Sequence, residues 1–302
     1  MEIIEFNGWK NCIRLENLLV DLVITTDIGP RVIRYGYLDE ENEFQEAPED
    51  QGKTGGSQWR PYGGHRLWHA PELAGRTNLP DNDSVAYEDH GDFVRVIQKT
   101  EALTGIQKEM DIRLSPVDTH VRVTHRLRNC GVWDVRLAPW ALTVMAPGGT
   151  AILPLPPRGS HPQDLQPANP LVLWAYTDLS DPRWIWGRQY ILARQDPLVK
   201  VPQKIGALIP SGWMGYARRS HLFIKKFAYD SQANYPDMGC SAEVFICDSM
   251  LELETLGQMQ TIPPGATVEH IEDWYLFRDV PTPHNDSQVE RHILTKMVET
   301  GV

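Results

Sequence analysis

The segment from residue 62 to residue 72 holds the densest group of reactive side chains in the sequence, and it reads YGGHRLWHAPE. Its polar and aromatic members are His65, Arg66, Trp68, His69 and Glu72. Imidazole exchanges a proton near neutral pH, while indole and guanidinium groups suit polar, ring-shaped ligands. Because burying so many polar groups is costly, we predict a ligand site here; the alternative is a polar structural loop at the corner of a β-sandwich.

An extended backbone would sort these side chains onto two faces, because successive residues of a strand point in opposite directions. His65 and His69 would then share one face, and Arg66 with Trp68 would occupy the other. We expect both imidazoles to border one cleft.

The same spacing offers ligands for a metal, since His65, His69 and Glu72 are all zinc-binding residue types. The helical zinc motif, however, places a glutamate directly after its first histidine, and Arg66 stands there. Pro71 also disfavours a helix at this point. We therefore predict no metal and no cofactor.

The amino-acid composition argues against some classes of binding partner. The chain of 302 residues carries 29 basic and 40 acidic side chains, for a net charge of −11. That balance argues against nucleic-acid binding. No apolar run is long enough to span a membrane, and the four cysteines form no CxxC pair. The N-terminus lacks the basic and apolar regions of a signal peptide, so a cytoplasmic protein is expected. No oligomeric state is predicted.

The elements that would position these side chains are short strands. The 23 prolines and 23 glycines divide the chain into short apolar runs with strand character. These runs are 18–26, 92–98, 120–127, 242–247 and 250–255. Only residues 287–299 show helical spacing, through Val289, Ile293 and Met297. We predict one all-β domain, mostly antiparallel, built as a sandwich or barrel.

Several motifs resemble the galactose mutarotase-like (aldose 1-epimerase-like) superfamily. Residues 27–33, DIGPRVI, resemble its early G-x-R-I strand. Residues 251–257, LELETLG, are followed by Pro263-Pro264-Gly265 and by the pattern H-x-E-x-W at 270–274, and they resemble its C-terminal strands. Ala266 departs from the family's glutamate after the turn. The resemblance implies a β-supersandwich over residues 1–302, with a sugar-binding cleft on its concave face.

The resemblance also implies an acid–base mechanism. Mutarotation needs a base for the anomeric hydroxyl and an acid for the ring oxygen. Glu254 matches the family's base, and Glu252 would share its strand face. Trp140 stands where the family has its acid histidine, so His65 or His69 is the expected replacement. The predicted substrate-binding side chains are Arg31, Arg66, Trp68, Glu72, Trp140, Lys225 and Glu252.

These expectations lead to a carbohydrate-active protein of the aldose 1-epimerase type, acting on a small-molecule sugar or sugar acid. Two alternatives stay open. Loss of the acid histidine at Trp140 favours a carbohydrate-binding protein without catalysis. A sugar lyase would use the same cleft, with Glu254 removing a carbon-bound proton. His125, in an apolar run, is expected to be a core histidine.

Overall fold

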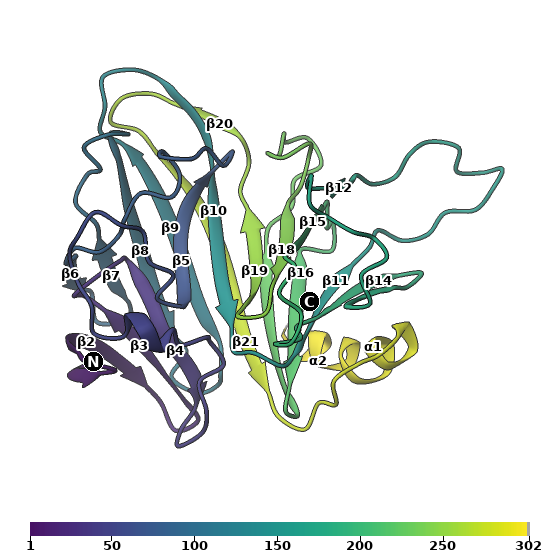
Figure 1. Ribbon diagram of the computed structural model, residues 1–302, viewed down its shortest axis with the longest axis horizontal. Helices are drawn as coiled ribbons and strands as arrows, with labels where there is room; N and C mark the ends of the chain where they lie inside the picture. The colour runs from purple at the N-terminus through teal and green to yellow at the C-terminus, as the bar shows by residue number, and fades with distance from the viewer. Residues whose placement is uncertain (301–302) are drawn as a thin grey trace.

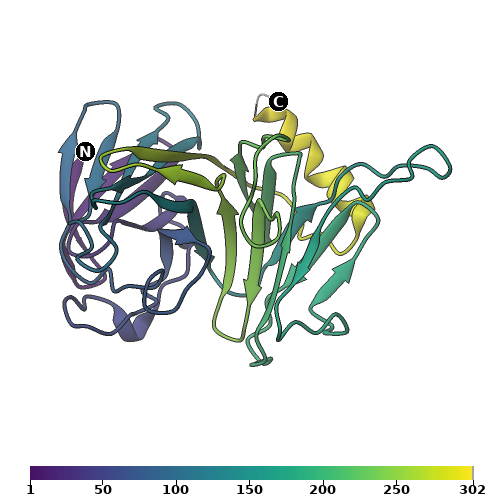
Figure 2. The same cartoon turned by 90° about the horizontal axis from the view of Figure 1, so that it is seen from above.

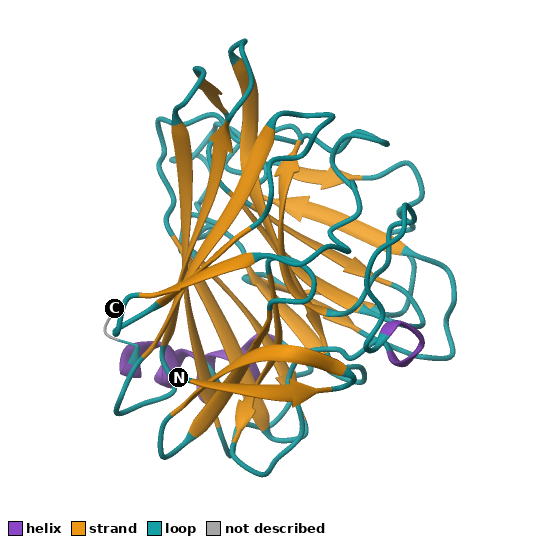
Figure 3. Cartoon of the chain, turned by 90° about the vertical axis from the view of Figure 1, so that its left-hand side faces the viewer, coloured by secondary structure: helices purple, strands orange, loops and turns teal. Residues whose placement is uncertain are grey.

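A computed structural model describes residues 1–300, so the last two residues of the predicted domain lie outside the described part. Strands make up 44% of the chain and helices 5%. The strands form two large sheets whose pairings are all antiparallel, and these sheets stack face to face (Figures 1 and 3). The prediction of an all-β, mostly antiparallel supersandwich is confirmed.

The first sheet runs in the order β1-β2-β3-β4-β5-β10-β19-β18-β15-β12, and β20 pairs with β10 beside this path. Its strands are β1 (Glu2–Phe6), β2 (Trp9–Glu16), β3 (Val20–Thr25), β4 (Arg31–Tyr37), β5 (Gly64–Ala70), β10 (Val135–Met145), β12 (Leu171–Leu173), β15 (Gln203–Ala207), β18 (Ala242–Ile246), β19 (Leu251–Leu256) and β20 (Gln260–Ile262). Strands distant in sequence thus become neighbours: β5 pairs with β10, and β10 pairs with β19.

The second sheet has the order β13-β14-β11-β16-β17-β21-β9-β8-β7-β6. Its strands are β6 (Ala86–Asp89), β7 (Val94–Ile97), β8 (Ile106–Leu114), β9 (Val121–Asn129), β11 (Thr150–Pro154), β13 (Trp184–Trp186), β14 (Tyr190–Arg194), β16 (Trp213–Arg218), β17 (His221–Phe227) and β21 (Thr267–Phe277). All five runs predicted as strands are strands in the structure, with ends that differ by at most two residues.

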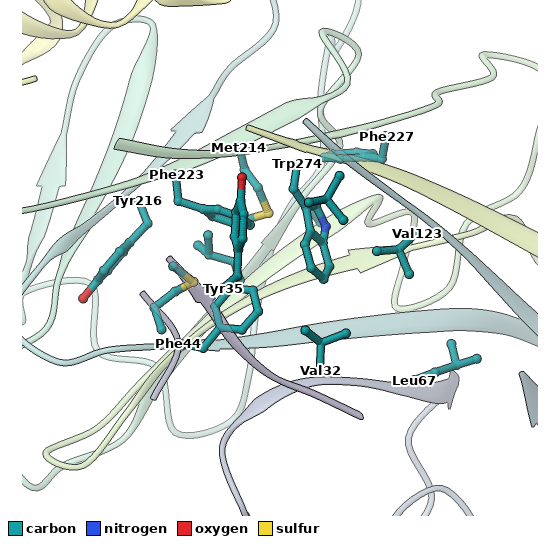
Figure 4. Close-up of a cluster of buried hydrophobic side chains, with 14 of the residues drawn as sticks. Val32, Tyr35, Phe44, Leu67, Val123, Met214, Tyr216, Phe223, Phe227 and Trp274 are labelled. Carbon is teal, nitrogen blue, oxygen red and sulfur yellow. The ribbon is translucent and has the colours of Figure 1, made fainter. Parts of the chain in front are cut away.

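The main core lies between the two sheets, where alternate residues of each strand meet. Leu67 and Leu253 enter it from the first sheet, and Phe223 and Trp274 from the second. Tyr35, Phe44, Phe223 and Trp274 pack their rings against one another at 5.5 to 6.1 Å (Figure 4). Because strand side chains alternate, each inward residue leaves its neighbours on the outer face of its sheet.

Two short helices end the described chain and cover part of the outer face of the second sheet (Figure 2). They are α1 (Asp286–His292) and α2 (Leu294–Glu299), and the side chain of Asn285 caps the first. Val289, Ile293 and Met297 are buried together with Leu222 and Ile224 of β17. The predicted helix over residues 287–299 is confirmed, as two pieces. A 3-10 turn, η1 (Pro48–Asp50), is the other helical segment described.

Within residues 1–300, no helix has the length and hydropathy needed to cross a membrane.

Candidate functional site

Strand β5 divides the 62–72 segment between two environments. Arg66 and Trp68 point to the outer face of the first sheet, where Arg66 meets Glu252 of β19. His65 points to the opposite face and contacts Thr143 and His125. The predicted alternation is therefore confirmed. The expectation that both imidazoles border the cleft is wrong, because that same alternation turns them into the space between the sheets.

A cavity of about 330 Å³ lies on the outer face of the first sheet. Its lining residues are Trp59, Arg66, Trp68, Glu72, Trp140, Leu142, Tyr176, Lys204, Phe245, Cys247, Met250 and Glu252. We call this cavity the outer cleft. Five side chains predicted from the sequence as substrate-binding residues thus line one cavity: Arg66, Trp68, Glu72, Trp140 and Glu252. Their roles in binding stay predictions.

Arg66 and Glu252 form the central ion pair of the outer cleft. Arg66 Nη2 donates to Oε1 of Glu252 at 2.9 Å. The guanidinium lies over the rings of Trp68, at 4.5 Å, and Trp59, at 5.6 Å. Its Nε and Nη1 are buried and have no hydrogen-bond partner in the described chain. Burial raises the pKa of Glu252 above its usual value, although Arg66 opposes the rise. The cleft therefore holds unused donors beside a carboxyl whose pKa is raised by burial.

Glu254 shares the outer face with Glu252 but lies beneath the cleft rather than in its lining. Its Oε2 accepts from Trp140 Nε1 at 2.9 Å and from Lys204 Nζ at 2.8 Å. The side chain has 0% exposure, and Oε1 has no hydrogen-bond partner in the described chain. Between the two glutamates, Glu252 is the one that borders the cavity.

Lys204 links the cleft to this buried layer. Its Nζ lies 2.8 Å from Oε2 of Glu243 as well as 2.8 Å from Glu254. The ammonium also lies over the rings of Trp140 and Trp174, at 4.7 and 4.8 Å. Burial would lower the pKa of Lys204, but the two glutamates outweigh it and raise that pKa. Burial raises the pKa of Glu243 well above its usual value. Lys204 therefore stays charged, while Glu243 tends to keep its proton.

Two predicted substrate-binding cations lie outside the outer cleft. Arg31 pairs in register with Arg66, but it is fully buried and donates to Asp81 at 2.6 Å and to the backbone oxygens of Pro61 and Gly63. Lys225 points inward from β17 with 0% exposure. Neither side chain lines the outer cleft, so the structure does not bring them together with the other predicted substrate-binding residues. Both satisfy buried acceptors instead.

His65 belongs to a hydrogen-bonded chain between the sheets, the inner network. His125 Nδ1 faces the backbone oxygen of His270 at 2.9 Å, so it must donate. In a neutral ring, His125 Nε2 then accepts from His65 Nε2, at 2.7 Å. His65 Nδ1 in turn accepts from the hydroxyl of Thr143, at 2.8 Å. Burial, followed by His125 and Lys225, lowers the pKa of His65 well below its usual value. The expected core role of His125 fits its place in this network.

The inner network also contains a buried carboxylate. Glu272 contacts Lys225 Nζ at 3.0 Å and accepts from Trp274 Nε1 at 2.8 Å and from the hydroxyl of Thr255. Burial alone would raise the pKa of Glu272, but Lys225 and the nearby imidazoles outweigh it and lower that pKa. Every polar side-chain atom of Glu272, Lys225, Trp274 and Thr255 has a hydrogen-bond or ion-pair partner, which is typical of a structural network.

The structure also bears on metal binding. Ligand atoms of His65, His125 and Glu272 lie within 4.8 Å of one another. These atoms already satisfy one another and Lys225, whose positive charge disfavours a second cation. His69 also lies on the inner face, where its Nε2 has no partner in the described chain, and burial lowers its pKa to about 4. Glu72 lies on the outer cleft, away from both. The alternative site formed by His65, His69 and Glu72 therefore does not come together.

Sequence reasoning missed Lys204, Glu243 and Tyr176. One signal was present for Lys204, which is a single charge in the otherwise uncharged strand QKIGA of residues 203–207. Its partner Glu254 lies 50 positions away, so the pairing follows only from the order of β15, β18 and β19. Tyr176 lies in a loop after β12 and had no pattern to mark it.

No family model and no curated protein matches this chain. Solved structures do match. A galactose mutarotase-like protein from Lactobacillus casei is 10% identical, covers 88% of this chain and 100% of its own, and has a TM-score of 0.58. A Klebsiella pneumoniae protein provisionally assigned as an aldose 1-epimerase is 10% identical, with coverage of 98% and 86% and a TM-score of 0.58. A provisionally assigned mutarotase from Salmonella typhimurium is 9% identical, with coverage of 89% and 90% and a TM-score of 0.56.

At these identities the similarity concerns the fold, and it agrees with the two stacked antiparallel sheets described above. The chain therefore has the galactose mutarotase-like fold.

Proposed function

We propose that the outer cleft binds a carbohydrate and that Glu252 performs acid–base chemistry of the aldose 1-epimerase type on it. One observation carries the proposal: buried donors of Arg66 without partners lie beside a carboxyl in a cavity walled by aromatic rings. Indole faces bind the apolar faces of sugar rings, while charged groups bind the hydroxyls through strong hydrogen bonds. The structural neighbours named as epimerases or mutarotases support the same class.

Anomer exchange requires a group that accepts a proton from the sugar and later returns it. Glu252 would remove the proton from the anomeric hydroxyl while a solvent water molecule gives a proton to the ring oxygen and the C1–O5 bond breaks; ring closure would return both protons. The open-chain aldehyde would then rotate about C1–C2 and close with the opposite configuration. Arg66 holds Oε1 of Glu252 and leaves Oε2 for this exchange. The raised pKa of Glu252 brings it closer to neutral pH, where general catalysis works best.

This proposal shifts the base suggested by family resemblance from Glu254 to Glu252. Glu254 has 0% exposure, and its Oε2 is held by Trp140 and Lys204. Its expected role is to hold the indole of Trp140 in the floor of the cleft. The two roles predict different behaviour for two substitutions of the same kind on the same strand.

A second candidate is carbohydrate binding without catalysis. Trp140 occupies the position that the resemblance assigns to an acid histidine, and both imidazoles of β5 turn to the inner face. A cleft with a carboxyl but no imidazole in its lining would bind a sugar without accelerating anomer exchange. A lyase stays a less supported alternative, since Glu254 does not border the cavity.

The test is NMR measurement of anomer exchange and of binding across a panel of sugars. We expect Glu252→Gln to lower the exchange rate by about 10²-fold or more while binding persists. Glu254→Gln should change the rate by less than about tenfold and mainly weaken binding. The reverse order would return the base to Glu254. Binding without acceleration would favour the second candidate, and a panel in which nothing binds would reject a carbohydrate cleft.

A further inference from the structure

We infer that the outer cleft selects its ligand by charge: it prefers a sugar that carries an ammonium group, accepts a neutral sugar, and rejects sugar acids and sugar phosphates. This inference rests on the proposed function, because it names the substrate class of the same cleft. Its basis is which charged side chains in and beneath the cavity form ion pairs and which do not.

Both cations of the cleft are already neutralised by carboxylates. Arg66 is paired with Glu252 at 2.9 Å. Lys204 lies 2.8 Å from both Glu254 and Glu243, and the carboxylate of Glu254 compensates its charge. The unpartnered donors of Arg66 can bind a ligand hydroxyl, but an anionic ligand that took over the charge of either cation would leave a buried carboxylate uncompensated. Neither cation therefore offers the ligand an uncompensated positive charge.

The charge left over at the cleft is negative. Glu72 lines the cavity, is exposed, and forms no ion pair within residues 1–300. Glu252 adds a second carboxyl to the lining, with Arg66 engaged at only one of its oxygens. An ammonium group on the ligand would find these carboxylates as partners, and a carboxylate or phosphate would be repelled.

The aromatic wall supports the same preference. Trp59 is 37% exposed and Tyr176 is 43% exposed, so both rings keep accessible surface beside Glu72 in the lining. Aromatic faces attract cations and have no such attraction for anions. An ammonium near this wall would gain from the rings as well as from the carboxylates.

The experiment is binding by isothermal titration calorimetry or NMR at about pH 6.5, where a sugar ammonium is charged. Glucosamine, N-acetylglucosamine, glucose, glucuronate and glucose 6-phosphate share one ring and differ in charge. We expect glucosamine to bind about tenfold or more tightly than glucuronate, with the neutral sugars between them and the differences shrinking at high salt. The acetylated sugar is the matched control, because it keeps the nitrogen and loses the charge.

Two variants test the source of the selection. Glu72→Lys should reverse the order of glucosamine and glucuronate, and Glu72→Gln should bring the two closer together. Because Glu72 is exposed, neither change should disturb folding. Glu269→Gln, on the second sheet and paired with Arg126, is the control that should leave the order unchanged.

The outcomes separate the two proposals. Glucuronate or glucose 6-phosphate binding as tightly as the neutral sugars overturns charge selection and leaves carbohydrate binding intact. Failure of every sugar to bind overturns the carbohydrate cleft, and the selection with it. An order that survives Glu72→Lys unchanged overturns the assignment to this cleft's charges.

Discussion

The first sheet carries polar clusters on both of its faces, and the two differ in how completely they are satisfied. On the inner face, each polar side-chain atom of His65, His125, Glu272 and Lys225 has a partner. On the outer face, Arg66 and Glu254 keep buried polar atoms that are unpartnered within the described chain, next to a cavity of about 330 Å³. Both clusters are buried and charged, so burial alone does not distinguish them.

We interpret this difference as a structural role for the inner cluster and a ligand-binding role for the outer one. A buried polar group without a partner costs free energy, and proteins keep such groups where something else satisfies them. The inner network needs no further hydrogen-bond partners, and its disruption should lower the free energy of unfolding. The outer cleft retains unused donors and acceptors, and its loss should affect binding. Each prediction below tests this contrast, beginning with the largest effect.

Lys225→Met should break the inner network. Removing the ammonium leaves Glu272 as a buried carboxylate without its cation, a change that costs about 3–5 kcal/mol of unfolding free energy. Urea denaturation monitored by tryptophan fluorescence measures the loss. Lys226→Met is the matched control, since the neighbouring side chain points to the opposite face and is partly exposed. Equal effects of the two substitutions would contradict a structural role for the inner network.

The inner network should also make the fold sensitive to acid. Burial, opposed in part by Glu272, lowers the pKa of His270 to about 3, while in the unfolded chain it titrates near 6.5. Below the unfolded value the unfolded state binds more protons, so stability falls as the pH drops from about 6.5 to about 3. Each such histidine contributes a loss of up to about 1.4 kcal/mol per pH unit in that window.

Thermal unfolding between pH 3 and 8 measures this slope. His270→Gln should flatten it by about one proton, whereas His90→Gln, at an exposed site, should leave it unchanged. A slope that steepens after His270→Gln would refute this account.

The contribution of the outer cluster to the pH dependence of stability should have the opposite sign. Burial raises the pKa of Glu243, so the stability that this group contributes is present at low pH and is lost as the pH rises above the pKa of the unfolded chain.

A matched pair of tryptophans compares the two faces directly. Trp274 Nε1 donates to Glu272 in the inner network, and Trp140 Nε1 donates to Glu254 under the outer cleft. Trp274→Phe removes a donor from a buried carboxylate in the main core and should cost about 1–3 kcal/mol of unfolding free energy. Trp140→Phe should cost less stability, because Lys204 still holds the same oxygen of Glu254, and should weaken ligand binding more. A larger loss of stability in Trp140→Phe and a larger loss of binding in Trp274→Phe would contradict the roles assigned to the two clusters.

The fold was predictable because its signals are local. Alternating apolar residues and frequent turns mark strands such as β9 and β19, the motif at 27–33 leads into β4, and the motifs at 251–257 and 270–274 lie on β19 and β21. The alternation of side chains along β5 was also predictable, but the sequence did not show which face of the sheet carries the cleft. That choice depends on which neighbours β10 and β19 bring to each side, such as Glu252 at 186 positions from Arg66. The imidazoles were therefore assigned to the wrong face.

The smallest effect on stability should come from the wall of the outer cleft. Trp59 lies in a loop with 37% exposure, and its ring contacts Trp68 and the guanidinium of Arg66. Trp59→Ala should change the unfolding free energy by less than about 1 kcal/mol, since the indole lies outside both sheets and is partly exposed. It should nevertheless weaken sugar binding several-fold, because a stacking face is lost. Trp133→Ala, at a site of 80% exposure in the loop between β9 and β10, is the control and should change neither quantity. Unaltered binding in Trp59→Ala would remove the aromatic wall from the account of ligand recognition, and the unpartnered donors of Arg66 would have to carry it alone.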